Sequence, residues 1–266
     1  MKVPQSQVTH FNSGKLKLEI HPDKMAAGAA AARAAATEIC RLAQIHQCIA
    51  VIFATGASQL DMLDALTSTP GLPWSQVRGF HLDEYVGLDE SHPASFRRYL
   101  REKLTRRVPM REFFEIDGNA ADIDSFCRDY VHRLHLAAPQ LCLLGIGENG
   151  HLAFNDPLEA NFEDPQAIKM VDLDETCCRQ QVAEGWFNSL EEVPKRALTL
   201  TIPTLLRVPK LIASVPGPRK AQIVRRTLEE PITTNCPSTI LRNHQDVTIY
   251  LDVDSAAALT GVSLPH

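Results

Sequence analysis

The sequence predicts an α/β fold in which a mostly parallel β-sheet carries helices on both faces. Short apolar segments alternate with longer amphipathic segments along the 266 residues, and this alternation is typical of βαβ units. The apolar segments have Val, Ile and Leu at successive positions, so both faces of each strand are expected to be buried, as in a parallel sheet. No repeat or low-complexity linker divides the chain, which predicts a single domain over residues 1–266.

Six apolar runs are the expected strands, namely Cys48–Ala54, Val77–Leu82, Leu141–Ile146, Leu198–Ile202, Leu211–Val215 and Val247–Leu251. Helices are expected near residues 24–45, 58–67, 93–106, 120–135, 175–187, 218–229 and 254–260. The first of these is rich in alanine and carries charged residues, as a helix of a globular domain does. Ser58 can cap the second, Pro93 and Ser95 mark the start of the third, and Arg219 and Lys220 lie at the start of the sixth.

Composition excludes several classes of function. The net charge is -5, with 22% charged and 44% hydrophobic residues, so the chain has neither a nucleic-acid footprint nor a basic surface for anionic membranes. No signal peptide and no apolar run long enough to span a bilayer is present. The seven cysteines include no CxxC pair, which argues against a disulfide framework and a zinc knuckle. A cytoplasmic protein is therefore expected.

Chemically active residues follow four of the expected strands. Thr55, Gly56, Ala57 and Ser58 follow the first, the pair Asp83 and Glu84 follows the second, and Gly147 to His151 follow the third. Pro216 to Lys220 follow Leu211–Val215. Because ligands of open parallel sheets bind beyond the carboxyl ends of the strands, we expect these four segments to line one pocket.

The glycines of Gly145-x-Gly147-x-x-Gly150 match the fingerprint of dinucleotide-binding proteins. That fingerprint requires a helix to begin at its glycines, with the helix N-terminus facing the pyrophosphate. Here Asp156-Pro157 follows within a few residues, and proline disfavours the helical conformation of the residue before it. A nicotinamide cofactor is therefore not expected, and the segment is interpreted as an active-site loop.

Two of the segments suit a phosphate group. Small and hydroxyl residues at 55–58 open a helix, whose first N–H groups can bind an anion, although Ser58 as an ordinary helix cap is an equal alternative. Arg219 and Lys220 begin a later helix, where positive charge is disfavoured, and this favours a functional role. The GK[ST] ending of a nucleotide P-loop is absent, so ATP is not expected.

The other two segments suit proton transfer. Asp83 can act as a general base, whereas Glu84 can instead serve the helix that begins nearby. His151, with Asn149 and Asp156, can form a proton shuttle. No second histidine is placed to complete a metal site, so no metal is expected. The residues predict proton-transfer chemistry on a small phosphorylated metabolite.

Several short motifs are distinctive. The most specific are Asp83-Glu-Tyr-Val-Gly-Leu88 with His92-Pro93, and Gly150-His-Leu-Ala-Phe-Asn155. Asp117-Gly-Asn-Ala120, Val193-Pro194 and Lys220-Ala221 accompany them. Together these motifs resemble the family that contains glucosamine-6-phosphate deaminase (isomerase) and 6-phosphogluconolactonase. The lactonases usually depart from the Tyr-Val-Gly-Leu and His-Pro patterns, so the resemblance favours the deaminases.

The resemblance implies a three-layer αβα, Rossmann-like fold and the conversion of glucosamine 6-phosphate and water to fructose 6-phosphate and ammonia, without metal or cofactor. His151 would open the sugar ring, assisted by Asn149 and Asp156, and Asp83 would transfer a proton between C2 and C1. Glu84 would lie beside Asp83. The phosphate would be held by Thr55, Gly56, Ala57, Ser58 and Lys220, near Gly147.

The sequence also departs from the family pattern. Asp156 stands where members usually carry Glu, and Asn149 where many carry Asp. The phosphate-binding arginine of the later helix has no direct counterpart, since Glu184-Gly-Trp-Phe187 stands there, and Arg179 is expected to replace it. These departures keep two alternatives open: a related sugar-phosphate lactonase or isomerase, and a sugar-phosphate sensor without catalysis. A homo-oligomer also stays open, and the partner expected is a small phosphorylated amino sugar.

Overall fold

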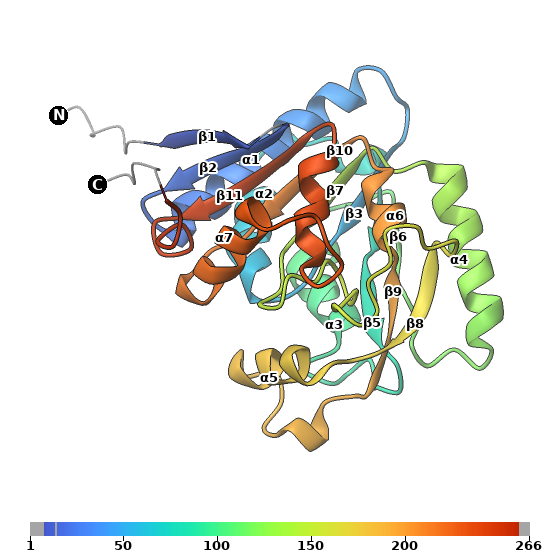
Figure 1. The fold of residues 1–266 in the computed structure, drawn as a ribbon. Coiled ribbons are helices and arrows are strands. Elements are labelled where there is room, and N and C mark those ends of the chain that lie inside the picture. Colours follow the sequence, from blue (N-terminus) through green and yellow to red (C-terminus); the bar gives the residue numbers. More distant parts are fainter. Residues whose placement is uncertain (1–7, 14, 261–266) are drawn as a thin grey trace.

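A computed structural model describes residues 8–13 and 15–260 of the chain, and its main feature is an eight-stranded sheet (Figure 1). Its strands are β1 (Thr9–Ser13), β2 (Leu16–His21), β3 (Ile49–Phe53), β4 (Val77–His81), β6 (Glu112–Phe114), β7 (Leu141–Leu144), β10 (Lys210–Ser214) and β11 (Val247–Asp252). They lie in the order β1-β2-β11-β10-β7-β3-β4-β6. Only the β1–β2 pair within this sheet is antiparallel. The predicted mostly parallel sheet is therefore confirmed.

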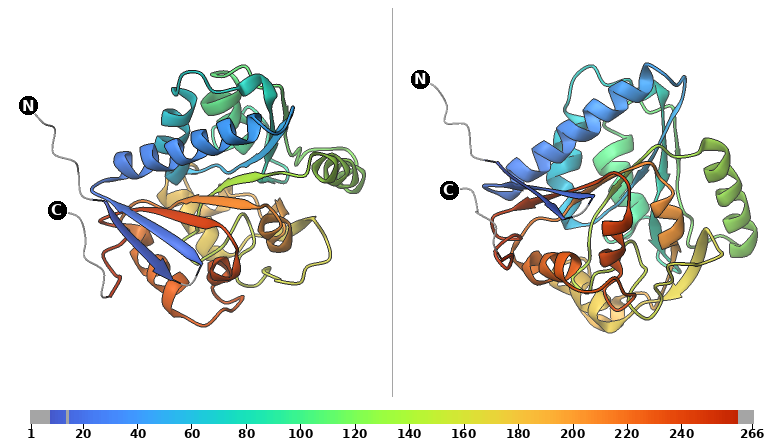
Figure 2. Two further views of the ribbon diagram at one scale, coloured as in Figure 1. Left: turned by 90° about the horizontal axis from the view of Figure 1, so that it is seen from above. Right: turned by 45° about the horizontal axis from the view of Figure 1, so that its top comes forward.

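Helices cover both faces of this sheet, as Figure 2 shows. One face carries α1 (Lys24–Ala43), α2 (Leu60–Thr67) and α3 (Phe96–Leu100). The opposite face carries α4 (Ile123–Ala137), α6 (Ile202–Leu206) and α7 (Ala221–Glu229). In β3, Val51 and Phe53 pack in the core that contains Leu63 of α2. The intervening Ile52 packs in the core that contains Leu134 of α4. Successive strand residues point to opposite faces, so both faces are buried and the three-layer αβα architecture is confirmed.

A second, three-stranded antiparallel sheet consists of β5 (Asp83–Tyr85), β9 (Arg196–Leu200) and β8 (Ile168–Asp172). The helix α5 (Glu175–Ala183) follows β8 and lies at the lower edge of the molecule in Figure 1. The expected strand Leu198–Ile202 belongs to this small sheet, and Ile202 already begins α6. The prediction placed it among the parallel strands because a short apolar run indicates burial but not its strand partner.

Two further expectations needed correction. Residues 254–258 form turns and not a helix; the Asp252 carboxylate accepts hydrogen bonds from the backbone N–H groups of Ser255 and Gly217. The helix expected near 93–106 consists of α3 and a π-helical segment, Arg101–Thr105. Short 3₁₀ helices occupy Ala57–Gln59, Trp74–Gln76, Leu190–Glu192, Pro218–Lys220 and Pro237–Asn243. Within residues 8–13 and 15–260, no helix is long and apolar enough to cross a bilayer.

Candidate active site

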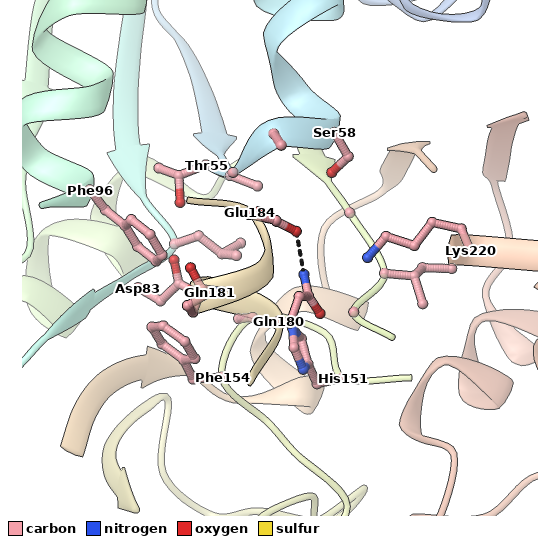
Figure 3. Close-up of a pocket in the computed structure, with 18 residues that line it drawn as sticks. Thr55, Ser58, Asp83, Phe96, His151, Phe154, Gln180, Gln181, Glu184 and Lys220 are labelled. Carbon is pink, nitrogen blue, oxygen red and sulfur yellow. Dashed lines mark hydrogen bonds between the residues drawn. The ribbon is translucent and has the colours of Figure 1, made fainter. Parts of the chain in front are cut away.

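The four segments that the sequence singled out meet at one cavity. Their strands, β10, β7, β3 and β4, are consecutive neighbours in the sheet, and their carboxyl ends therefore lie at the same edge. The cavity is lined by Thr55 to Ser58, Asp83, Gly147 with His151, and Lys220 (Figure 3). The expectation that these segments share a pocket is confirmed. The lining also includes Phe96, Phe154, Gln180, Gln181 and Glu184.

The loop after β3 is fixed by contacts to its backbone carbonyls. Gly56 has a φ of +96°, a backbone conformation that residues other than glycine rarely adopt. Tyr99 donates its hydroxyl to the carbonyl oxygen of Gly56 at 3.0 Å, and Ser214 at the end of β10 donates to that of Ser58 at 3.0 Å. The loop therefore enters α2 in a fixed orientation, with the first N–H groups of the helical segment available to an anion.

Lys220 supplies the cation of this region. Its side chain reaches the cavity from the start of α7 and is 6% exposed as a residue. Burial lowers the pKa of Lys220, and the nearby carboxylates of Glu184 and Glu148 oppose that shift. An ammonium held in a place of low solvation gains most from an anionic ligand. The arrangement suits a phosphate between Lys220 and the loop at 55–58.

His151 lies over Gly147 and is flanked by an acid and an amide. Nδ1 of His151 is 2.8 Å from Oδ1 of the fully buried Asp156. Asn149 donates to the same carboxylate oxygen at 2.8 Å, and its own Oδ1 accepts the backbone N–H of His151 at 3.0 Å. A Cβ on Gly147 would come within 2.2 Å of the imidazole ring, so this packing requires glycine.

Asp156 reaches His151 despite being one methylene shorter than glutamate. Burial acts to raise the pKa of Asp156, but the interactions with His151 and Asn149 outweigh it and leave the pKa below its usual value. The carboxylate is therefore ionised and can stabilise an imidazolium at His151. Asn149 also donates to Asp174 at 2.9 Å, which ties the loop to the start of α5.

Asp83 stands at the cavity wall with few polar contacts. It is 5% exposed, and its Oδ1 has no hydrogen-bond partner among the described residues. Burial, followed by the negative charge of Glu84, raises the pKa of Asp83 well above its usual value. Perturbed carboxyl groups in a cavity are typical of proton-transfer sites.

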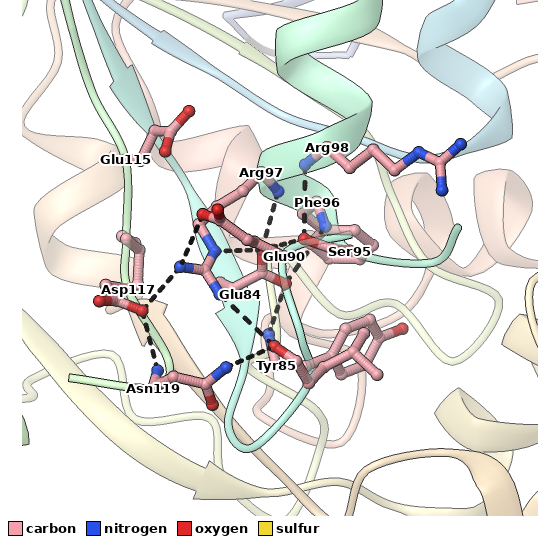
Figure 4. Close-up of polar contacts among 12 residues, drawn as sticks. Glu84, Tyr85, Glu90, Ser95, Phe96, Arg97, Arg98, Glu115, Asp117 and Asn119 are labelled. Carbon is pink, nitrogen blue, oxygen red and sulfur yellow. Dashed lines mark hydrogen bonds and ion pairs between the residues drawn. The ribbon is translucent and has the colours of Figure 1, made fainter. Parts of the chain in front are cut away.

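Glu84 does not line the cavity, which corrects its expected place in the substrate site. Its carboxylate is fully buried and accepts the backbone N–H groups of Tyr85, Phe96 and Arg97 (Figure 4). The hydroxyl of Ser95 donates to it as well. Glu84 thus holds the N-terminus of α3, the structural role that the sequence left open. Its charge still affects the cavity, because it raises the pKa of Asp83.

Arg179 also lies away from the cavity, and the expectation that it replaces the family arginine needs correction. Its side chain is 66% exposed and pairs with Glu175, one turn earlier in α5. Residues four positions apart lie on the same face of a helix. The face that carries Glu175 and Arg179 is exposed to solvent. The residues of this region that do line the cavity are Gln180, Gln181 and Glu184.

Glu184 is a charged residue of the cavity that the sequence interpretation missed. Its side chain is 6% exposed and its carboxylate accepts Nε2 of Gln180 at 2.8 Å and Nε1 of Trp186 at 3.1 Å. Nη2 of Arg219 lies 3.8 Å away. An acid therefore lies beside the basic residues of the anion site, where it balances part of their charge. The sequence offers one signal for Glu184: it lies in the segment where the family's phosphate-binding arginine is expected.

Comparison with known proteins identifies the family. Residues 22–250 match the sequence profile described as glucosamine-6-phosphate isomerases/6-phosphogluconolactonase. A glucosamine-6-phosphate deaminase of Exiguobacterium sibiricum is 33% identical over 78% of this chain and 80% of its own. One of Arthrobacter sp. is 35% identical over 77% and 80%, respectively.

Solved structures agree with this assignment. A monomeric glucosamine-6-phosphate deaminase superposes with a TM-score of 0.82 at 28% identity, covering 91% of this chain and 99% of that one. A 6-phosphogluconolactonase of Thermotoga maritima shares the fold at a TM-score of 0.72 and 17% identity, over 88% and 98% of the two chains. The protein therefore belongs to the glucosamine-6-phosphate isomerase/6-phosphogluconolactonase family.

Proposed function

We propose that the protein converts glucosamine 6-phosphate and water to fructose 6-phosphate and ammonia. The observation that carries the proposal is that Asp83 and His151 line one cavity together with Lys220 and the loop at 55–58. This cavity combines two proton carriers with an anion site. The names of the similar deaminases point to the same substrate.

Binding begins with the phosphate, which Lys220 and the N–H groups at the start of α2 would hold. Thr55 and Ser58 offer hydroxyl groups to it, and Gly56, Ala57 and Gly147 allow close approach of the backbone. Anchoring the phosphate fixes the sugar relative to Asp83 and His151. Much of the catalytic effect of such a site comes from this orientation.

Ring opening is assigned to His151. Protonation of the ring oxygen, with loss of the proton from the C1 hydroxyl, yields the open-chain aldehyde. Asp156 stabilises the charged imidazole, and Asn149 fixes the position of both groups. Histidine is suited to this exchange because its ordinary pKa lies near neutral pH.

Isomerisation is assigned to Asp83. Burial raises the pKa of this carboxyl, and the ammonium of the substrate supplies the positive charge that favours its ionised form. The carboxylate removes the proton from C2 to give an enolamine and returns it to C1 to give a ketimine. Water adds to C2, and ammonia leaves to give the ketone. These proton transfers require neither a metal nor a cofactor.

An ammonia assay with a panel of sugars tests the proposal. Glucosamine 6-phosphate should release ammonia and fructose 6-phosphate in equal amounts, whereas glucosamine without the phosphate should react far more slowly. Hydrolysis of 6-phosphogluconolactone without ammonia release from the amino sugar would instead favour the lactonase alternative. Saturable binding of glucosamine 6-phosphate with no product would identify a sensor.

We further propose that the whole chain works as one domain in the cytoplasm. Support for one domain comes from the cavity, which draws its lining from residues as far apart in sequence as 54 and 220. All seven cysteines are free, in agreement with a reducing compartment. Cell fractionation tests the location, and sedimentation analysis tests whether copies of the chain form a homo-oligomer.

A further inference from the structure

Cys177 adds a third ligand-type atom to the pair formed by His151 and Asp156. A ring nitrogen of His151, a carboxylate oxygen of Asp156 and Sγ of Cys177 all lie within 4.8 Å of one another. The first two residues belong to the loop after β7, and Cys177 projects from α5. Imidazole, carboxylate and thiolate are the three side-chain ligands that zinc binds in proteins.

The cluster has unused bonding capacity. Oδ2 of Asp156 has no hydrogen-bond partner among the described residues, and the 2.8 Å contact between Oδ1 and Nδ1 of His151 lacks hydrogen-bond alignment. Asp156 and Cys177 are 0% and 1% exposed. Buried polar atoms without a partner are uncommon in proteins and often mark an ion or water position. A cation between these side chains would use both atoms.

The charges of the cluster also fit a divalent cation. One carboxylate and one thiolate would neutralise it, and His151 would bind as neutral imidazole. The carboxylates of Asp174 and Asp83 act on Cys177 as well and add further negative potential. A thiol binds zinc as the thiolate, so metal binding would release the thiol proton to solvent.

We propose that His151, Asp156 and Cys177 form an inhibitory zinc site inside the catalytic cavity. The ion is held by three protein ligands, and water completes a tetrahedral set, as in zinc sites with an open position. A metal on the imidazole prevents His151 from carrying the proton of ring opening. The site itself depends only on the three ligands, whereas inhibition rests on the proposed deaminase activity. Mg²⁺, which prefers oxygen ligands, does not compete at this site.

Cobalt(II) provides a readout that does not depend on catalysis, because it replaces zinc and absorbs when bound to thiolate. The metal-free protein should bind one Co²⁺ and develop the thiolate-to-cobalt charge-transfer band. Cys178, the adjacent half-buried cysteine, is the matched control. Cys178→Ser should retain the band, while Cys177→Ser and Cys177→Ala should lose it and bind Co²⁺ at least about tenfold more weakly, since both remove a ligand. No band in the wild-type protein, or a band that Cys177→Ala retains, would overturn the proposal.

Inhibition is measured separately. Zn²⁺ at micromolar concentration should abolish ammonia release by the wild-type protein and by Cys178→Ser, a chelator should restore it, and Mg²⁺ should have no effect. Each rate is compared with that of the same variant without metal. Equal sensitivity of Cys177→Ala to Zn²⁺ would show that the inhibitory ion binds elsewhere. A protein that binds Co²⁺ through Cys177 but releases no ammonia would retain the site and refute only the proposed function.

Discussion

Nδ1 of His151 lies 2.8 Å from Oδ1 of Asp156, whose side chain is fully buried. Members of the family usually have glutamate at this position, and the shorter aspartate still reaches the imidazole. Asn149 holds the same oxygen from the other side at 2.8 Å. The acid therefore lies in contact with the imidazole and can stabilise its charged form.

Replacing this acid should disable ring opening without unfolding the protein. In Asp156→Asn the amide keeps the shape of the side chain but cannot stabilise the imidazolium. We expect kcat for glucosamine 6-phosphate to fall by about 10²–10³-fold, within the range of general acid–base effects, with KM little changed. Steady-state kinetics measure this. An unchanged kcat would show that Asp156 is not needed to support His151.

Asp83 should lower the free energy of unfolding of the protein at neutral pH. Since burial raises its pKa in the folded state, the folded protein binds the proton more tightly than the unfolded chain. Stability is therefore lost as pH rises from about 4, the unfolded pKa, through the folded pKa. Asp83→Asn avoids this loss and should be more stable at pH 7 by about 1–2 kcal/mol. The difference should shrink as the pH approaches 4.

Denaturant unfolding of the two proteins from pH 4 to pH 8 measures this difference. Asp89→Asn is a control, because that carboxyl is exposed and its pKa is lowered chiefly by Ser91. It should give no comparable gain in stability. A constant difference between wild type and Asp83→Asn across the pH range would contradict the raised pKa.

Glu184 should limit the affinity of the cavity for phosphate. In Glu184→Gln the repulsion between the carboxylate and a bound dianion is removed, and we expect KM for glucosamine 6-phosphate to fall by about tenfold, equivalent to about 1.4 kcal/mol. Inorganic phosphate should inhibit the variant more strongly than the wild type. Glu175→Gln, an exposed change at the start of α5, should leave both quantities unchanged. A rise in KM would show that Glu184 assists substrate binding.

The same variant should shift the pH profile. Glu184 acts to raise the pKa of Lys220, against burial, which lowers it. Its removal should lower the pKa of Lys220 further, so the alkaline limb of kcat/KM should begin at lower pH in Glu184→Gln. If the alkaline limb begins at the same pH in both proteins, the ionisation of Lys220 does not control substrate binding.

Lys220 and Arg179 should differ sharply in their effect on the substrate. Lys220→Met removes a buried cation from the cavity and should raise KM by about 10–100-fold, the range for a hydrogen bond to a charged group. Arg179→Ala removes an exposed i,i+4 pair and should change KM by less than about twofold. A large rise in KM for Arg179→Ala would mean that α5 rearranges when substrate binds.

The part of the fold that local pattern controls was predictable. Strands such as Ile49–Phe53 have apolar residues on both faces because they lie between two helical layers, and the sequence displays this directly. Strands β1, β2, β5, β6 and β8 were not predicted. In β5, β6 and β8, three to five residues of mixed polarity carry little periodic signal. Strand β9 has the composition of a central strand yet pairs with β5 and β8. Its partners are set by tertiary structure and not by its own residues.

The residues of the site were likewise predictable where the sheet topology places them, and not where tertiary packing does. Residues at strand ends, such as Asp83 and His151, were found because the topology of a parallel sheet brings those ends together. Arg179 was misplaced because one helical turn decides whether a side chain faces the cavity or solvent. Glu184 and Cys177 were missed because their roles arise from the way α5 packs over the cavity. Nothing local to their sequence distinguishes them from ordinary helix residues.

The most direct measurement compares ammonia release from glucosamine 6-phosphate by the wild-type protein and by Asp83→Asn under saturating substrate. The account predicts that the wild type forms ammonia and fructose 6-phosphate one-to-one. Asp83→Asn should bind the substrate with similar affinity but react at least about 10²-fold more slowly, because its amide cannot accept the proton from C2. Near-equal rates for the two proteins, or no ammonia from the folded wild type, would contradict it.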